Sequence, residues 1–523
     1  MNKKQFFLLI LFFLTFNVNA QYHIHYFGKP MRKAPDKTDV PTFNMAFFDA
    51  KNILASEEAN NRQKSKPTYQ FGKTFDVSID LLKQPQWKQE AKGRVFRYRI
   101  KAEGAKSISF AYKKFFLAEN AWLKIYTPDS SMVMGPIAGG IFKTPDSFAT
   151  DLLIGDESII ELFEPEGAIG TSVVQIEKVT LGYRDYFAAE QEAAISNGRT
   201  ETALACQRNV ICESNYTNES NAVALCFFGE DGYTGQLINN SGVISNANSQ
   251  RPYFITAFHS IELAPALIAS STVFRFKYRS SQCNNNIIPP QSSWFVWSMG
   301  ADVRAIHEAT DVALLELRTG SLGVFGFNQM LANNGIWYLG WSRYNCGLNT
   351  SAAPVACLHH PRGDLMKISL SRLPVTTNLP PTFQIDPPYN PVNFNFVTFN
   401  SGSPQTIGAG TQPGSSGSGL LDQNKRLIGV LTGGAPVNPS CNNPDYSYYG
   451  RFDLAWEGGG TPNTRLKDWL DPGNLNVMTL NSSPANSTTT AGSPNFPVTN
   501  LISVSGAGMS VCQSGLGLGV IYV

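Results

Sequence analysis

The sequence has no cysteine before Cys206, although eight cysteines lie between that position and residue 512. It also has no CxxC pair and no HExxH motif, so we expect no zinc site or other metal centre. Charged residues make up only 16% of the chain and the formal net charge is +2, which gives no reason to expect a nucleic-acid partner. Long helical periodicities are few, and we therefore expect mainly β structure.

Long apolar runs are also scarce after the first twenty residues. Lys3 and Lys4 precede the apolar stretch FFLLILFFLTF, and the small residues of VNA end at Ala20. This pattern is typical of a signal peptide that is cut before Gln21. An uncleaved anchor is the other interpretation, but the run is short for a membrane-spanning helix. We expect a soluble, secreted protein with no membrane partner, in an oxidising compartment where cysteines can pair.

Composition divides the rest of the chain into two β-rich parts. Residues 21–70 are polar and predict an irregular, extended chain. From about 71 to 185, segments such as GRVFRYRIKA and SISFAYKKF alternate apolar and polar residues, which predicts a β-sandwich. Residues 186–205 are small, polar and Ala-rich, as in a linker or a cleavable junction. A second β-rich block covers about 206–472, and a Ser/Thr/Asn/Pro-rich segment follows it.

The stretch TQPGSSGSGLLD, residues 411–422, has the composition of a flexible linker. However, a hairpin pattern follows it directly, because two apolar segments flank the polar turn 422–426. A flexible linker would not lead at once into a core hairpin. Gly414 and Gly417 allow a tight turn in which successive N–H groups can face one oxyanion. We therefore interpret this stretch as a loop that carries a catalytic serine.

Two other motifs supply the base and the acid that a serine nucleophile needs. His259 follows a strand-like segment in YFITAFHSIE, and Asp311 precedes an apolar strand in ATDVALLELR. Taken singly, these residues fit a structural histidine at a strand end and a turn aspartate. Together with the serine loop they have the order His, Asp, Ser. That order belongs to chymotrypsin-like proteases, whereas subtilisin-like and α/β-hydrolase enzymes use other orders.

The segments TAFHS, DVALLEL and GSSGSG resemble the motifs around the His, Asp and Ser of chymotrypsin-like proteases. This resemblance maps the nucleophile to Ser416 and the oxyanion donors to the N–H groups of Gly414 and Ser416. The segments CQRNVIC, GQLINN, LHHP, YGRF and GGGTPNTRLKDWLDP are similar to those of bacterial lysyl endopeptidases, a branch of the same clan. The resemblance implies an all-β fold of two six-stranded antiparallel barrels, with the triad in the cleft between them.

The family is made with a long propeptide, which fits the cysteine-free region before a cut around residues 196–205. Ser415 stands where trypsin-like zymogens have an aspartate that binds the freed N-terminus. We therefore predict that the propeptide folds with the protease, blocks its cleft and is then removed. The expected parts are a signal peptide (1–20), a propeptide region with a β-sandwich-like domain (21–200), the protease domain (201–480) and a linker with a short tail (481–523).

These features predict a secreted, monomeric serine endopeptidase that forms an acyl-enzyme with protein or peptide substrates. It is expected to need no cofactor and to have its own propeptide as a partner. The alternative function is that of a catalytically inactive binding protein on a protease fold.

The resemblance leaves the specificity of the enzyme open. A protease that cuts after Lys or Arg needs a carboxylate in its P1 pocket, and the family places it three residues before the Gly of YGR. That position is Ser447, whereas Asp445 lies two residues upstream. Either Asp445 reaches the pocket or the pocket floor is a serine. Thr432 replaces a family histidine, and Gly433 lies beside it in GVLTGG, a segment expected to pair with the substrate backbone.

Disulfide bonds are also implied by the resemblance. Two pairs carry over from the family, and both close long loops. Cys346 and Cys357 are eleven residues apart and can form a bridge of their own, while Cys226 and Cys512 either pair or leave one thiol free. The pairs that the family implies are Cys206–Cys441 and Cys212–Cys283.

Overall fold

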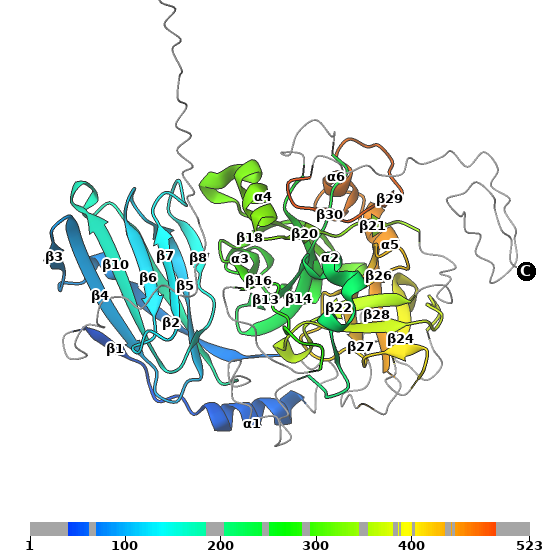
Figure 1. Ribbon diagram of the computed structural model, residues 1–523, viewed down its shortest axis with the longest axis horizontal. Coiled ribbons are helices and arrows are strands. Elements are labelled where there is room, and N and C mark those ends of the chain that lie inside the picture. The colour runs from blue at the N-terminus through cyan, green and yellow to red at the C-terminus, as the bar shows by residue number, and fades with distance from the viewer. Residues whose placement is uncertain are drawn as a thin grey trace, which may run out of the picture.

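The chain forms two β-rich units that lie side by side in Figure 1, an N-terminal sandwich (residues 40–184) and a C-terminal domain (residues 203–487). The predicted signal peptide, the tail beyond residue 487 and most of the junction at 186–205 lie outside the described residues. The computed structural model describes residues 40–61, 69–184, 203–242, 250–284, 293–344, 354–379, 385, 389–399, 403–434, 441 and 445–487.

The N-terminal sandwich consists of two β-sheets with a shared core, which confirms the sandwich predicted from the sequence. From Phe96 to Lys101 burial alternates along the strand, so one row of side chains faces the core. Buried side chains of both sheets, including Ile160 and Val179, belong to one apolar cluster. The first sheet contains β1 (Thr42–Asn44), β3 (Lys88–Glu90), β4 (Gly93–Lys101), β6 (Trp122–Tyr126), β7 (Val133–Ala138) and β10 (Glu157–Pro165). The second contains β2 (Gly72–Asp80), β5 (Ser107–Phe116), β8 (Asp146–Ala149), β9 (Leu153–Ile154) and β11 (Val173–Gly182).

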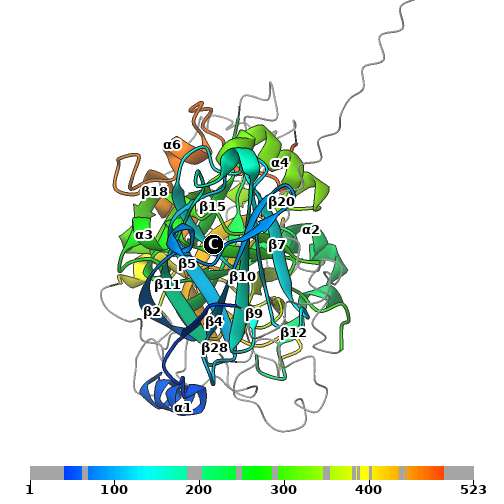
Figure 2. The ribbon, with the colours of Figure 1, turned by 90° about the vertical axis from the view of Figure 1, so that its left-hand side faces the viewer.

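The prediction of an irregular chain over residues 21–70 is wrong for its described part. After β1 the chain forms the helix α1 (Ala50–Asn61), whose sequence AKNILASEEANN is rich in good helix formers. Its Glu57 carboxylate is buried and pairs with Arg184 at 2.5 Å. Figure 2 shows α1 below the sandwich strands, at the edge of the molecule. A tertiary ion pair therefore supports a helix that the polar composition did not indicate.

Two sheets build the C-terminal domain, antiparallel except where β21 runs parallel to β27, which confirms the predicted all-β, chymotrypsin-like fold class. The described residues form seven strands in one sheet and ten in the other, whereas the resemblance implied six strands in each barrel. Two-residue strands account for four of the ten. The seven strands are β13 (Val223–Phe228), β14 (Asp231–Leu237), β15 (Tyr253–Ala257), β16 (Val273–Phe276), β17 (Phe295–Trp297), β18 (Ala301–His307) and β19 (Val312–Leu317). The ten are β12 (Arg208–Asn209), β21 (Trp341–Ser342), β22 (Val355–His359), β23 (Lys367–Ser371), β24 (Phe394–Phe399), β25 (Thr406–Ile407), β26 (Gly419–Leu421), β27 (Leu427–Gly434), β28 (Asp445–Arg451) and β29 (Thr479–Leu480).

The domain continues past the boundary expected at residue 480. A two-stranded sheet joins β20 (Trp337–Tyr338) to β30 (Ser483–Pro484), and the Ser483 hydroxyl accepts a hydrogen bond from Asn239 at 3.0 Å. The segment after residue 480 is therefore packed as far as it is described. Short helices lie between the strands: α2 (Thr217–Ser220), α3 (Pro265–Ser270), α4 (Gly323–Asn333), α5 (Phe452–Glu457) and α6 (Lys467–Leu470).

The cysteines follow the family pattern in part. The structure contains the bonds Cys206–Cys441 and Cys212–Cys283. The suggested Cys346–Cys357 bridge is wrong, because Cys357 is a free thiol buried in β22, where its sulfur contacts the Ser418 hydroxyl at 3.2 Å. Cys226 is also free and buried, and burial raises the pKa of both thiols. Cys346 and Cys512 lie outside the described residues.

Candidate active site

His259 and Asp311 meet just beyond the ends of two adjacent strands. Ala257 at the end of β15 pairs with Val312 at the start of β19, so the next residues outward lie beside each other. The His259 Nδ1 atom is 2.6 Å from Asp311 Oδ2, and the His259 backbone N–H donates to Asp311 Oδ1 at 2.8 Å. One carboxylate thus holds both the imidazole ring and the backbone that carries it. This is the orienting contact that an imidazole base requires.

Asp311 is fully buried, and its backbone lies in the left-handed region, with φ 54°. Asp tolerates this region better than most residues, and here it turns the chain from the short 3₁₀ turn at 308–310 into β19. Tyr389, from the loop before β24, also hydrogen-bonds to the Asp311 carboxylate. Burial, together with the charge of Asp311, raises the pKa of Tyr389. The phenol therefore stays protonated and can only donate to the carboxylate at neutral pH.

The Gly/Ser-rich stretch is a loop that leads directly into a hairpin, as the sequence predicted. β26 and β27 pair antiparallel on either side of the turn at 422–426, where the Asp422 backbone N–H donates to the Arg426 carbonyl. Ser416, half-buried in the loop, accepts a hydrogen bond at its carbonyl from the Thr234 N–H at 2.9 Å. A Cβ on Gly417 would lie 2.2 Å from the Thr234 carbonyl and 3.0 Å from the Ala257 nitrogen. The loop therefore lies against β14 and against the strand end that carries His259.

Tyr233 connects the loop and the histidine from the other side. It precedes Thr234 in β14, and its ring lies edge-on to the His259 ring with 5.9 Å between centroids. The His259 side chain is 17% exposed, so one part of the imidazole remains accessible. His259 and Ser416 thus face the same short stretch of β14.

Some backbone amides of the serine loop donate hydrogen bonds within the protein and others do not. The Ser415 N–H donates to the Gln412 carbonyl at 2.9 Å and the Gly417 N–H donates to the Leu431 carbonyl at 2.8 Å. The amides of Gly414 and Ser416 have no acceptor among the described residues. Gly414 has φ +93°, and a Cβ there would meet the backbone of residues 360–363 at 3.0–3.1 Å. These two amides have the pattern expected of oxyanion donors.

Two buried polar side chains that sequence reasoning missed join the two sheets at this loop. The Gln236 amide donates to the carbonyls of Ile255 and Gly417 and accepts from the Gly419 N–H, at 2.8–3.0 Å. The Thr234 hydroxyl donates to the Gly414 carbonyl at 2.9 Å. Gln236 stands in the family-like segment GQLINN, but that resemblance gave it no role, and Thr234 stands in none of the segments singled out in the sequence.

Hydroxyl groups line the segment expected to form the P1 pocket. Ser447 is fully buried and its hydroxyl lies 2.9 Å from that of Thr411, the first residue of the serine loop. Thr432 stands at a register shift between β27 and β28, and its buried hydroxyl has no partner among the described residues. Gly433 follows, paired with Tyr448. Asp445 is the first residue of β28, and its side chain lies outside the described part of the structure.

The described residues contain neither a membrane-spanning helix nor a cluster of metal ligands. None of the helices in the described ranges is long and apolar enough to cross a membrane. In the same ranges, no group of three or more His, Cys, Asp or Glu side chains is arranged to hold a metal ion.

A known protein family is similar to this part of the chain. Residues 200–450 match the family described as lysyl endopeptidase, C-terminal domain. The C-terminal domain is lysyl endopeptidase-like. The match includes His259, Asp311 and Ser416, and it ends at Gly450 within β28, although the lysyl endopeptidase-like domain itself packs on to residue 487.

Solved structures with similarity to this chain include several proteases. Rv3671c from M. tuberculosis H37Rv, in an inactive mutant form, is 15% identical with a TM-score of 0.28, covering 48% of this chain and 91% of that one. A Glu endopeptidase is 16% identical with a TM-score of 0.25, and the match covers 49% of this chain and 89% of that one. The HtrA-type protease AlgW is 15% identical with a TM-score of 0.27, and the match covers 47% of this chain and 61% of that one. At these values the solved structures add nothing to the family match.

Proposed function

We propose that this protein is a secreted serine endopeptidase in which Ser416 is the nucleophile, His259 the base and Asp311 the orienting acid. The family match supports a serine protease hydrolase. The observation that carries the proposal is the double contact of Asp311 with the ring and the backbone of His259, at 2.6 and 2.8 Å, beside the loop of Ser416. A structural histidine would not need an orienting carboxylate, an exposed edge and a neighbouring serine loop together.

The reaction follows from these positions. The Ser416 hydroxyl oxygen attacks the substrate carbonyl carbon and gives its proton to Nε2 of His259, while Asp311 accepts the hydrogen bond from Nδ1. The amides of Gly414 and Ser416 stabilise the oxyanion that forms on the carbonyl oxygen. His259 then returns the proton to the leaving amine, which leaves an ester on Ser416. Water hydrolyses this ester by the same proton transfers in reverse, and the carboxyl product is released.

Replacement of Ser416 tests the assignment directly. Ser416→Ala should lower kcat by roughly 10⁵-fold or more, and it should abolish labelling by a fluorophosphonate probe. Ser418→Ala is the matched control in the same loop, since its buried hydroxyl contacts the Cys357 sulfur and not the cleft. We expect the Ser418 variant to remain labelled. Labelling of Ser416→Ala at full rate would exclude Ser416 as the nucleophile.

The family match does not favour an inactive binding protein on the same fold. The same probe distinguishes the two functions, because a binding protein without a competent triad would not react at Ser416. A folded wild-type protein that resists both the probe and a peptide substrate would favour the binding protein.

We further propose cleavage after Lys, or after Lys and Arg, with Asp445 supplying the charge. The lysyl endopeptidase match supports this specificity, and Asp445 lies two positions from the buried Ser447 in the same strand. Digestion of a denatured protein, followed by mass spectrometry of the new termini, tests the proposal. Cuts confined to Lys, or to Lys and Arg, are expected. Cuts after apolar residues would mean that the hydroxyls of Ser447 and Thr411 form an uncharged pocket.

We also propose that the N-terminal sandwich is a propeptide, exported with the aid of residues 1–20 and removed by a cut around 196–205. Support comes from the start of β14, which pairs with β15 only at Gln236 and Leu237 and where the Gly232 N–H donates to the Tyr69 carbonyl at 2.9 Å. Two residues further on, the Thr234 N–H donates to the Ser416 carbonyl. The sandwich backbone thus lies next to the proposed nucleophile, where an extended substrate would compete with it.

N-terminal sequencing of the protein from culture medium tests the precursor arrangement. A mature chain that begins between residues 196 and 205 is expected, with activity that rises as the sandwich is lost. An active chain that begins near Gln21 would show instead that the sandwich is a permanent part of the enzyme.

A further inference from the structure

The two units meet around a buried ion pair. Asp151 lies between β8 and β9 of the sandwich, and Arg275 lies in β16 of the C-terminal domain. The Arg275 guanidinium donates to both carboxylate oxygens of Asp151, at 3.0 and 2.5 Å. The side chains are 0% and 1% exposed. This is the bidentate geometry in which arginine recognises a carboxylate most specifically.

The C-terminal domain provides an aromatic pocket for this arginine. The guanidinium lies 4.8–4.9 Å from the ring centroids of Phe227, Tyr278 and Trp294, all from the C-terminal domain. The rings keep water away and place the cation where a planar anion can pair with it. Phe71 of the sandwich packs edge-on against Phe227 at 5.1 Å, next to the contact of Tyr69 with β14. The pocket therefore lies close to the place where the sandwich reaches the edge of the candidate active site.

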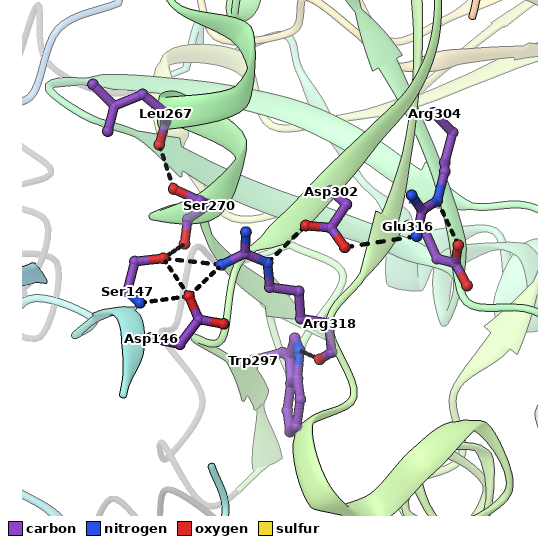
Figure 3. A network of polar contacts seen from close by, with 9 residues as sticks. All are labelled: Asp146, Ser147, Leu267, Ser270, Trp297, Asp302, Arg304, Glu316 and Arg318. Carbon is purple, nitrogen blue, oxygen red and sulfur yellow. Dashed lines mark hydrogen bonds and ion pairs between the residues drawn. The ribbon is translucent and has the colours of Figure 1, made fainter. Parts of the chain in front are cut away.

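A second group of polar contacts crosses the same interface but is open to solvent. Figure 3 shows Arg318 between Asp146 and Ser147 of β8 and Asp302 of β18. The Arg318–Asp146 distance is 3.2 Å, and the Asp146 side chain is 49% exposed. Exposed pairs of this kind contribute little to binding, whereas loss of one partner of a buried pair leaves a charge without compensation.

We propose that Arg275 and its three rings form a carboxylate-selective docking site, and that Asp151 of the sandwich is its built-in ligand. When the junction between the units is cut, the sandwich should remain bound through this site as a non-covalent inhibitor. Release of Asp151, and not the cut itself, then limits the appearance of activity. The proposal deepens the precursor arrangement above, but its test requires no catalysis.

The test uses the full chain with Ser416→Ala and with the recognition sequence of a site-specific protease placed within residues 186–200. After cutting, the separation rate of the two pieces is measured by dilution of a fluorescently labelled sandwich. Asp151→Asn keeps the shape of the side chain and removes its charge, and we expect separation about 100-fold faster, as for other buried charged pairs. Asp146→Asn is the matched control on the neighbouring strand, with less than about a 5-fold effect expected.

A double-mutant cycle assigns the effect to the pair itself. Arg275→Met should accelerate separation as much as Asp151→Asn, and the double variant should be no faster than either single variant. If Arg275→Met does not fold, the comparison of Asp151→Asn with Asp146→Asn decides alone. Equal rates for these two variants, or strictly additive effects in the cycle, would overturn the proposal. A wild-type chain whose pieces part as soon as they are cut would overturn it as well.

Discussion

The hydroxyl of Ser415 lies 2.7 Å from Nδ1 of His359, at the position directly before the proposed nucleophile. Both side chains are fully buried, and Nε2 of His359 lies 3.2 Å from the Ser369 hydroxyl. In trypsin-like zymogens this serine position holds an aspartate that captures a freed N-terminus. Here a neutral imidazole fixes the residue without any new terminus. The serine loop can therefore hold its shape before any cut is made.

Ser415→Ala should lower the free energy of unfolding by about 1–3 kcal/mol, because Nδ1 of His359 loses its buried partner. The comparison is Ser418→Ala, whose hydroxyl contacts only a weakly bonding thiol and should change stability by less than about 1 kcal/mol. Urea unfolding of both variants in a Ser416→Ala background measures the difference. Equal stabilities would mean that the contact with His359 has no role in holding the loop.

Asp311→Asn should lower kcat by roughly 10³–10⁴-fold and leave KM nearly unchanged, because the amide favours the wrong tautomer of His259. Glu308→Gln serves as the control, since Glu308 is exposed in the preceding 3₁₀ turn. Steady-state kinetics on one peptide substrate separates kcat from KM. A loss confined to KM would point to a substrate-binding role for Asp311.

Tyr389→Phe should reduce kcat by about 10-fold, since the phenol is one hydrogen-bond donor to the Asp311 carboxylate and a typical bond of this kind to a charged group contributes 1.5–3 kcal/mol at most. The raised pKa of Tyr389 means that the phenol remains a donor to high pH. The wild-type profile should therefore show no loss of kcat from this group between pH 8 and 10. Tyr344→Phe, at a more exposed position, should have no effect.

Acid should destabilise the folded protein through His359 and His360. Burial lowers the pKa of each to about 3, whereas both take up a proton near pH 6.5 when unfolded. The unfolded state then binds more protons, so stability is complete above pH 6.5 and is lost as the pH falls toward 3. Each histidine contributes a slope of up to about 1.4 kcal/mol per pH unit. Urea unfolding at pH 4, 5, 6 and 7 should show a smaller slope for His359→Gln than for wild type.

Ser447→Asp should place a carboxylate against Thr411 and restore the family position of the charge. Asp445→Asn alone should lower kcat/KM for Lys substrates by at least about 10-fold, the cost of one charged contact. The double variant Ser447→Asp with Asp445→Asn should keep or raise the wild-type kcat/KM for the same substrates. Peptides that differ only at P1 measure the effect. Unchanged Lys cleavage in Asp445→Asn would remove Asp445 from the pocket.

The predictable parts of the fold and the site depend on short-range patterns. The hairpin after the serine loop follows from two apolar segments around a polar turn, and His259 and Asp311 follow from strand ends that lead into them. Tyr389 could not be found, because it lies 78 positions from Asp311 in an irregular Pro- and Asn-rich segment. The pair of Asp151 and Arg275 was also hidden, since only the packing of the two units brings these residues together.

The free thiol of Cys357 shows the limit of spacing as evidence. It lies eleven positions from Cys346, which is enough for a small disulfide loop, but its β-strand directs the sulfur into the core beside Ser418. Strand alternation decides which face a side chain occupies, and the linear distance between two cysteines does not record it.

The Gln236 amide also has a mechanical consequence. Two of its three hydrogen bonds, those with Gly417 and Gly419, join a strand of the seven-stranded sheet to the segment just after Ser416. A hinge motion that separated the two halves would have to break these bonds and would release the serine loop in the same step. Heat inactivation and the opening of the cleft should therefore share one activation barrier. This barrier should fall when Gln236 is replaced by a residue with a shorter side chain.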